Sequence, residues 1–284
     1  MTSWNSTNLP YTHADYHTNT WSQTGTKTLF LGNDGGLSVV RDPLRATPPF
    51  TVDPNDWAAV DVAFVDNRRN RNITSHLVYH LGSTIASSPA DSRYRITLGL
   101  QDLSSRVRVA EGAGLATSGT WNDPTGTGDG FGTLINSADG QKMMVSSYYT
   151  RPKRSVNGGS TWATMTSGIT GAGSGATAPF HTQLYPGRTD ATGNTVFTAT
   201  NLIIYKTTDW AATAWSALGM AGFTGTVIRN FNTSTTGNAM AIGANSGNVW
   251  GSTDGGAAWT NPKGGNIWPA NPGNLSYVWF DTAN

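Results

Sequence analysis

Ser155–Trp162 reads Ser-Val-Asn-Gly-Gly-Ser-Thr-Trp, and this stretch decides the fold. A second copy, Ser252–Trp259, reads Ser-Thr-Asp-Gly-Gly-Ala-Ala-Trp, so the shared pattern is Ser-x-Asp/Asn-x-Gly-x-x-Trp. An Asp or Asn side chain caps its own turn, and the glycine supplies a positive φ. The Trp opens the next strand and packs a large apolar ring beneath the turn. The motif therefore predicts a hairpin turn that recurs through a β-meander.

Two weaker copies extend the pattern. Thr207–Trp215 carries one extra residue before its Trp, and Gly32–Gly36 is a degenerate copy. The motif resembles the Asp-box (BNR) repeat of sialidase-type and sortilin-type β-propellers. This resemblance implies an all-β propeller of four-stranded blades. It implies little about activity, because the box is a structural turn.

Composition supports many short strands joined by polar turns. The chain has 284 residues, with 12% charged residues, 34 Gly and 11 Trp. A net charge of +1 gives no sign of a nucleic-acid or anionic-membrane partner, and the lack of cysteine excludes disulfides and cysteine metal sites. No apolar stretch is long enough to span a membrane, and no signal peptide follows Met1. The profile suits a secreted bacterial protein, extracellular or periplasmic.

Strand patterns predict five blades and part of another. The expected inner strands are His13–Trp21, Ser75–Leu81, Gly128–Phe131, Phe180–Tyr185 and Thr224–Phe231, with Leu275–Phe280 opening a sixth blade. The chain starts with the last strand of a blade and ends with the first strand of one. We expect a single propeller domain, 1–284, cut from a longer propeller protein. A six-bladed ring with an incomplete closing blade is the alternative.

The resemblance extends beyond the turn motif. His13–His17 followed by Gly32–Gly36, then Gly99–Asp102 and Gly128–Phe131, are similar to segments of large bacterial propellers related to xyloglucan-cleaving glycoside hydrolases and to sortilin. The resemblance implies a catalytic carboxylate pair, whose nearest matches here are Asp34 and Asp129. A glycosidase needs such a pair, one as acid and one as base or nucleophile.

Histidines fall at or near the starts of successive inner strands, which line the central channel of a propeller. The expected channel-mouth cluster is His13, Asp15, His17, His76, His80 and His181, close to Asp129. Three interpretations stay open: a hydrated channel lining, a divalent metal site built on His13, Asp15 and His17, or a catalytic or sugar-binding mouth. No other cofactor is expected.

Exposed aromatic residues are candidates for stacking on pyranose rings. They are Tyr148, Tyr149, Trp210, Trp250 and Trp268. The first function hypothesis is a propeller that binds or hydrolyses carbohydrate. The second is a non-catalytic scaffold for a protein ligand. The third is self-assembly, or pairing with a second propeller.

Overall fold

The computed structural model describes residues 16–21, 28–33, 36–41, 65–66, 78–83, 95–108, 121–126, 128–234, 236–265 and 278. The chain divides into two compact units, Met1–His76 and Leu77–Asn284. Among the described residues no helix is both long and apolar enough to cross a membrane.

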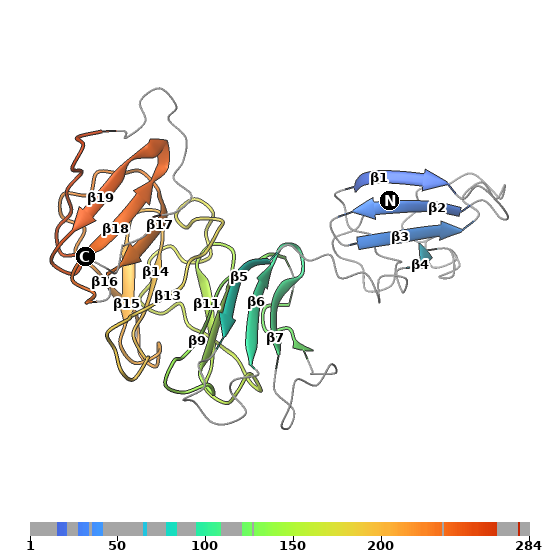
Figure 1. Cartoon of the computed structure of the whole chain (residues 1–284), viewed down its shortest axis with the longest axis horizontal. Helices are drawn as coiled ribbons and strands as arrows, with labels where there is room; N and C mark the ends of the chain where they lie inside the picture. The colour runs from blue at the N-terminus through green and yellow to red at the C-terminus, as the bar shows by residue number, and fades with distance from the viewer. Residues whose placement is uncertain are drawn as a thin grey trace. The chain divides into compact units, whose positions relative to one another are not determined.

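The described residues of the first unit form one antiparallel sheet, which we call blade 1 (Figure 1). Its strands are β1 (Tyr16–Trp21), β2 (Thr28–Asn33), β3 (Gly36–Arg41) and β4 (Val65–Asp66). They pair in sequence order, as a propeller blade requires.

The second unit contains four further sheets, numbered blade 2 to blade 5 in chain order. Blade 2 is β5 (Val78–Ser83), β6 (Ile96–Leu100), β7 (Ser104–Arg108) and β8 (Trp121–Asn122). Blade 3 is β9 (Gly130–Ile135), β10 (Met143–Ser147), β11 (Arg151–Ser155) and β12 (Ala163–Thr164). Blade 4 is β13 (Tyr185–Pro186), β14 (Val196–Ala199), β15 (Ile204–Thr207) and β16 (Ser216–Ala217). Blade 5 is β17 (Ile228–Thr233), β18 (Met240–Ala244) and β19 (Val249–Ser252), with the short 3₁₀ turn η4 (Asn245–Gly247) between its last two strands.

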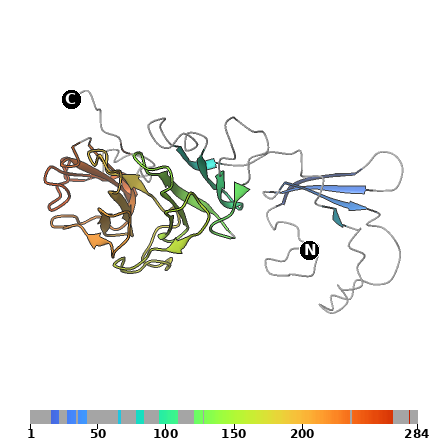
Figure 2. The same ribbon diagram turned by 90° about the horizontal axis from the view of Figure 1, so that it is seen from below.

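Neighbouring blades of the second unit lie side by side and bury their faces against each other (Figures 1 and 2). Phe197 and Ile204 of blade 4 share a buried cluster with Phe231 and Ile242 of blade 5. A second cluster joins blades 3 and 4, and a third joins blades 2 and 3. The core is therefore a series of layers between blades, and the all-β propeller prediction is confirmed.

The turn motif links the third and fourth strands of blades 3 and 4, and in blade 5 it follows the third strand, β19. In each copy the first hydroxyl accepts the backbone N–H of the fifth residue at 2.9 Å, and it donates to the third side chain at 2.7–2.9 Å. The hydroxyls belong to Ser155, Thr207 and Ser252. The fourth and fifth residues have positive φ in every copy, even where they are Trp210 (58°) and Ala211 (55°) instead of glycine. The hairpin prediction is confirmed.

Each motif is also braced against the first hairpin of its own blade. The N–H of the fourth residue donates to a loop carbonyl: Gly158 to Gln141, Trp210 to Asn194 and Gly255 to Asn238. Since strands alternate in direction, these loops and turns meet at one end of the blades, which we call the turn face.

The motif tryptophans act as wedges between blades. Trp215 and Trp259 are each 3% exposed. Their indole N–H groups donate to carbonyls of the preceding blade's last segment, Met165 and Gly219. The extra residue in the blade 4 copy leaves the hydrogen bonds of the turn intact, and the Trp215 indole reaches Met165 as Trp259 reaches Gly219.

The segment Gly32–Gly36 occupies a different place. Asn33 pairs with Gly36, so this segment joins the second and third strands of its blade, β2 and β3. The motifs of blades 3 and 4 join third and fourth strands, and the motif of blade 5 follows the third strand. The prediction that Gly32–Gly36 is a copy of the same turn is therefore wrong. A two-residue Asp-Gly connection is a common hairpin in its own right, which explains the similar sequence.

The inner strand of blade 4, expected at Phe180–Tyr185, is a strand only over Tyr185–Pro186. The preceding residues form other bonds: the carbonyl of Thr182 accepts the N–H of Gly132 from blade 3, and that of Gln183 accepts the hydroxyl of Thr198. A bond to blade 3 and a side-chain bond within blade 4 therefore replace the regular ladder at this point.

A β-bulge recurs in the inner strands. In each bulge one extra residue of the inner strand lacks its own partner on the next strand. The extra residues are His17 in β1, Tyr79 in β5, Phe131 in β9 and Arg229 in β17. A bulge redirects side chains and is frequent beside functional sites.

The expected sixth blade falls almost entirely outside the described residues. Val278 is the described member of Leu275–Phe280, and its carbonyl accepts the side-chain amide of Asn232 in β17. The partial closing blade and the single domain over 1–284 stay predictions.

Candidate functional site

An aromatic cluster occupies the end of the blades opposite the turn face. Its rings come from blades 2, 3 and 4 and pack in a chain of contacts. We call this region the aromatic face; its rings are Tyr79, Phe131, Tyr148, Tyr149, Phe180 and His181.

Phe131 is the buried centre of the cluster, at 1% exposed. Its ring centroid lies 4.9 Å from Tyr79, 4.7 Å from His181 and 5.3 Å from Phe180. Tyr79 and His181 come from blades 2 and 4, yet their centroids are 6.0 Å apart. The inner strands of three consecutive blades therefore meet at one aromatic contact.

His80 and His181, two members of the expected channel-mouth cluster, lie close enough for their charges to interact. Burial lowers the pKa of His80, against a weaker opposing effect of its hydrogen bond to the Thr133 backbone. Burial also lowers the pKa of His181, and repulsion by the His80 charge lowers it further. Both imidazoles are therefore neutral at pH 7. His80 bonds to the neighbouring blade, which suits the interpretation as a polar lining between blades.

The outer part of the face is formed by Tyr148, Tyr149 and Phe180. The Phe180 ring is 51% exposed, and both tyrosines are half-buried. Phe180 lies parallel to Tyr148 at 5.8 Å and edge-on to Tyr149 at 5.8 Å. The Arg151 guanidinium carbon lies 5.9 Å from the Tyr148 ring centroid. Apolar rings and one cation are thus presented together.

The turn that carries these tyrosines is held rigidly. Tyr149 and Thr150 adopt left-handed φ angles of 61° and 54°. Thr150 donates its N–H to the Thr182 hydroxyl at 2.7 Å and its own hydroxyl to the Ala199 carbonyl at 2.8 Å. A left-handed φ is energetically costly for a residue other than glycine. Such conformations persist where surrounding contacts enforce them, often at binding sites.

The backbone of Tyr149 is fixed by the loop that leads into blade 4. Its N–H donates to the Pro179 carbonyl at 3.1 Å, and its carbonyl accepts the Gly173 N–H at 2.6 Å. A Cβ at Gly175 would lie 3.0 Å from the Tyr149 ring, and one at Gly128 would lie 2.7 Å from the Tyr148 ring. Both rings therefore rest on glycine backbone.

Asp129 lies at the border of this face, just before β9. Its Oδ1 accepts the backbone N–H of Asp102 at 2.7 Å, which ties blade 3 to the second hairpin of blade 2. The carboxylate is half-buried. Asp34 lies outside the described residues, so the separation of the expected catalytic pair stays a prediction.

The other expected site residues lie between blades, at the aromatic face or outside the described residues. Trp210 (1% exposed) and Trp250 (7%) lie in the clusters between blades and offer little ring surface to a sugar. The side chains of His13, Asp15, His17, His76 and Trp268 lie outside what the structure describes. Among the expected stacking residues with described side chains, Tyr148 and Tyr149 keep part of their rings exposed.

No group of three or more His, Cys, Asp or Glu side chains suited to a metal ion occurs in the part of the chain that the structure describes. The expected metal ligands His13, Asp15 and His17 are outside that part, and the metal hypothesis stays a prediction.

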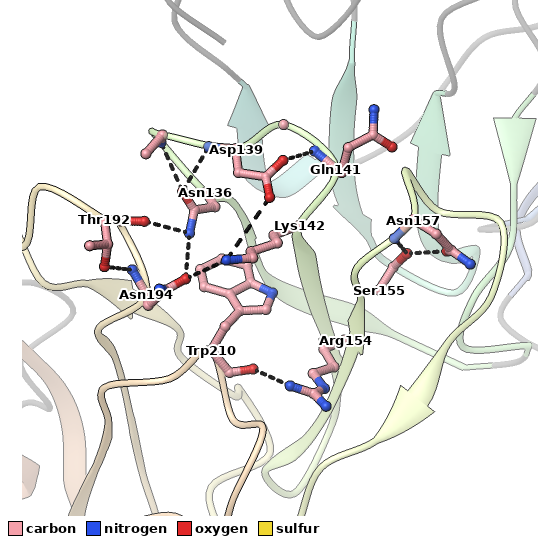
Figure 3. Close-up of polar contacts among 12 residues, drawn as sticks. Asn136, Asp139, Gln141, Lys142, Arg154, Ser155, Asn157, Thr192, Asn194 and Trp210 are labelled. Carbon is pink, nitrogen blue, oxygen red and sulfur yellow. Dashed lines mark hydrogen bonds and ion pairs between the residues drawn. The ribbon is translucent and has the colours of Figure 1, made fainter. Parts of the chain in front are cut away.

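A polar network at the turn face shows a contrasting kind of site (Figure 3). The amide of Asn136 in blade 3 donates to the Thr192 carbonyl and to Asn194 Oδ1 in blade 4, and Lys142 donates to the same Oδ1 at 2.9 Å. Arg154 donates to the Trp210 carbonyl at 3.1 Å. These polar groups bond to one another across the blades, so the network is a structural clamp.

Sequence reasoning missed the contribution of Tyr79, Phe131, Phe180 and Arg151. The available signal was an aromatic residue near the start of three successive inner strands. Strand patterning alone does not reveal this site, because the contacts between these rings depend on the packing of different blades.

No protein-family model and no curated protein sequence matches the chain. Among solved structures, the chain is similar to an ancestral GH74 enzyme, with a TM-score of 0.50 and 12% identity over 91% of this chain and 32% of that chain. It thus spans about a third of that enzyme's length. Weaker likenesses are to the β-propeller domain of Myceliophteria thermophila Cps50 (Swd1), with a TM-score of 0.43 and 9% identity over 87% of this chain and 67% of that chain. YCF48 bound to D1 peptide gives a TM-score of 0.42 and 17% identity over 66% of this chain and 55% of that chain.

At this level of identity the likeness to the GH74 enzyme establishes the fold and leaves ligand and activity open. The chain is a β-propeller, or part of one.

Proposed function

We propose that this protein is a carbohydrate-binding β-propeller that holds pyranose rings on its aromatic face. In this proposal the turn motifs are Asp-box (BNR) repeats, and the protein acts outside the cytoplasm, in the extracellular space or the periplasm. The observation that carries the proposal is the rigid, partly exposed set of Tyr148, Tyr149 and Phe180 rings beside Arg151.

The chemistry of a sugar suits this surface. A pyranose has apolar C–H faces and a polar hydroxyl edge, so it needs flat apolar rings together with a small number of polar groups. Tyrosine offers both in one side chain. Because the turn at Tyr149 is already fixed by hydrogen bonds, binding would cost little ordering of the protein.

The test is affinity electrophoresis or calorimetry of the full chain against a panel of plant and bacterial polysaccharides. We expect Tyr149→Ala and Phe180→Ala to weaken binding by about tenfold or more, as for aromatic anchors at the centre of an interface. Val156→Ala is the matched control, because Val156 is also an exposed apolar residue (54%) but lies on a turn motif at the opposite face. Unchanged binding by Phe180→Ala would reject the proposal.

Hydrolysis is the catalytic form of the same proposal, with Asp129 and Asp34 as the carboxylate pair. Asp129→Asn keeps an oxygen that can accept the Asp102 N–H, so the blade contact is retained. We expect this variant to bind polysaccharide and to release no reducing sugar. Equal turnover by Asp129→Asn would remove Asp129 from the catalytic assignment.

A non-catalytic scaffold for a protein ligand is the second candidate. Phe180 and Leu202 are both 51% exposed and belong to blade 4 segments on the aromatic face. Exposed apolar side chains of this kind also suit a protein partner, including a second propeller or another copy of the chain. Light scattering after size exclusion tests self-assembly, and Leu202→Asp should weaken a protein contact more than a sugar contact.

A further inference from the structure

Arg151 is a cation without a described carboxylate partner. It begins β11, directly after the turn that carries the tyrosines, and its side chain is exposed. One Nη2 donates to the Gly173 carbonyl at 3.0 Å, which leaves further N–H groups of the guanidinium available. The ion pairs among the described residues join Arg106 to Asp123 and Lys142 to Asp139.

Arg229 adds a second exposed cation at the inner strand of blade 5. It is the bulged residue of β17, and its carbonyl accepts the side-chain amide of Gln183 from blade 4. Within the described chain its guanidinium has no ion-pair partner. The aromatic residues of blade 4 therefore lie between two blades that each contribute an arginine.

The carboxylates of blades 4 and 5 lie at the other end of the strands. The described ones are Asp190, Asp209 and Asp254, all in turn-face loops. Each is engaged by local hydroxyl and N–H donors. The blade 4 and blade 5 part of the aromatic face therefore has none of these described carboxylates, which favours an anion beside Arg151 and Arg229.

Asp102 and Asp129 place carboxylate groups at one border of the aromatic face. They lie where blades 2 and 3 meet, next to Gly128, on which the Tyr148 ring rests. Carboxylates at this border suit the hydroxyl groups of a sugar, and they disfavour a second anion there. The anionic group of a ligand is therefore expected toward Arg151.

We infer that the ligand is an acidic saccharide, whose hexuronic-acid carboxylate pairs with Arg151 while its sugar ring packs on Tyr149 and Phe180. This inference rests on the proposed function and specifies its substrate class. A guanidinium matches a carboxylate through two parallel hydrogen bonds, a geometry that an ammonium group cannot reproduce.

The test compares two forms of one polymer: polygalacturonate and its fully methyl-esterified, uncharged form. Calorimetry with the full chain is expected to show about tenfold tighter binding of the acid form, the factor typical of one charge-assisted pair. Arg151→Gln should remove this preference and keep binding of the ester. Arg151→Lys should restore only part of it. Lys263→Gln is the control, because it removes an exposed charge beyond the last turn motif of blade 5.

Two results would overturn the inference: equal affinity of the wild type for both polymers, or an unchanged acid preference in Arg151→Gln. If ester and neutral polysaccharides bind through Phe180 without acid preference, the inference fails and the proposed function stands. If no saccharide of either kind binds, the proposed function fails with it. Circular dichroism of each variant separates loss of binding from loss of folding.

Discussion

The two faces of the second unit are built in opposite ways. At the turn face, blades 3, 4 and 5 repeat one set of hydrogen bonds, with a hydroxyl, a capping Asp or Asn and a brace to the first hairpin. At the aromatic face, the equivalent segments differ from blade to blade. One carries two tyrosines and an arginine, whereas another carries Leu202.

This difference separates stability from recognition. Repetition across blades indicates a contact that every blade needs in order to fold. A departure from repetition, held in place by left-handed residues such as Tyr149 and Thr150, indicates a surface kept for another purpose. Changes at the turn face should therefore alter the free energy of unfolding, and changes at the aromatic face should alter binding.

The largest effect is expected from Trp215→Ala. Removing this ring, which is 3% exposed, should lower the free energy of unfolding by about 3–5 kcal/mol, because a cavity opens between blades 3 and 4. Trp162→Ala removes a half-buried ring at the corresponding position and should cost less. Urea unfolding followed by circular dichroism measures both. Equal losses of unfolding free energy in the two variants would show that the contribution of a motif tryptophan does not depend on how deeply its ring is buried.

A smaller effect is expected from Ser252→Ala. It removes the hydroxyl that accepts the Gly256 N–H and donates to Asp254, and should cost about 1–2 kcal/mol. Ser160→Ala lies in a turn motif too, but its exposed hydroxyl caps nothing, so a change within about 0.5 kcal/mol is expected. An equal loss of stability in both variants would show that the Ser252 hydroxyl does not stabilise the turn by capping it. Saccharide binding should be unchanged in both.

The smallest effect concerns acid. Burial opposes ionisation of Asp190, but hydrogen bonds from Thr192 and Thr195 prevail and lower its pKa to about 2. A depressed folded-state pKa gives stability that is complete above about pH 4 and is lost as the pH falls toward 2. Because Asp190 is only half-buried, at the protein surface, solvent screens these interactions and the contribution should stay below about 1 kcal/mol. Unfolding midpoints between pH 7 and 2 should fall less steeply in Asp190→Asn; an identical slope would contradict this assignment.

The fold was largely predictable, because blades repeat and repetition is visible in sequence. The spacing from Ser155 to Trp162, and again from Ser252 to Trp259, identified turns whose hydrogen bonds agree with the expected ones. The motif gave a wrong prediction at Gly32–Gly36. An Asp-Gly pair occurs both in this turn motif and in two-residue hairpins, and only the strand pairing distinguishes the two.

The candidate site was less predictable, because it depends on contacts between blades. Tyr148 and Tyr149 could be named as exposed aromatics, but their neighbour Phe180 is thirty-odd residues away and meets them through blade packing. Trp210 and Trp250 are aromatic, like residues that stack on sugars. The sequence does not show that they are buried, because their burial depends on the neighbouring blade. Alternation along a strand cannot distinguish a side chain between blades from one in solvent.

The inner-strand bulges have a consequence for engineering. The bulge at Arg229 shifts the β17–β18 register by one residue and leaves an exposed side chain outside the regular pairing. Arg229 can therefore be exchanged without removing a ladder pair, whereas Tyr79, at the equivalent bulge, packs on the buried Phe131. A library randomised at Arg229 should keep the turn motifs and the scaffold intact, which urea unfolding of its members would check.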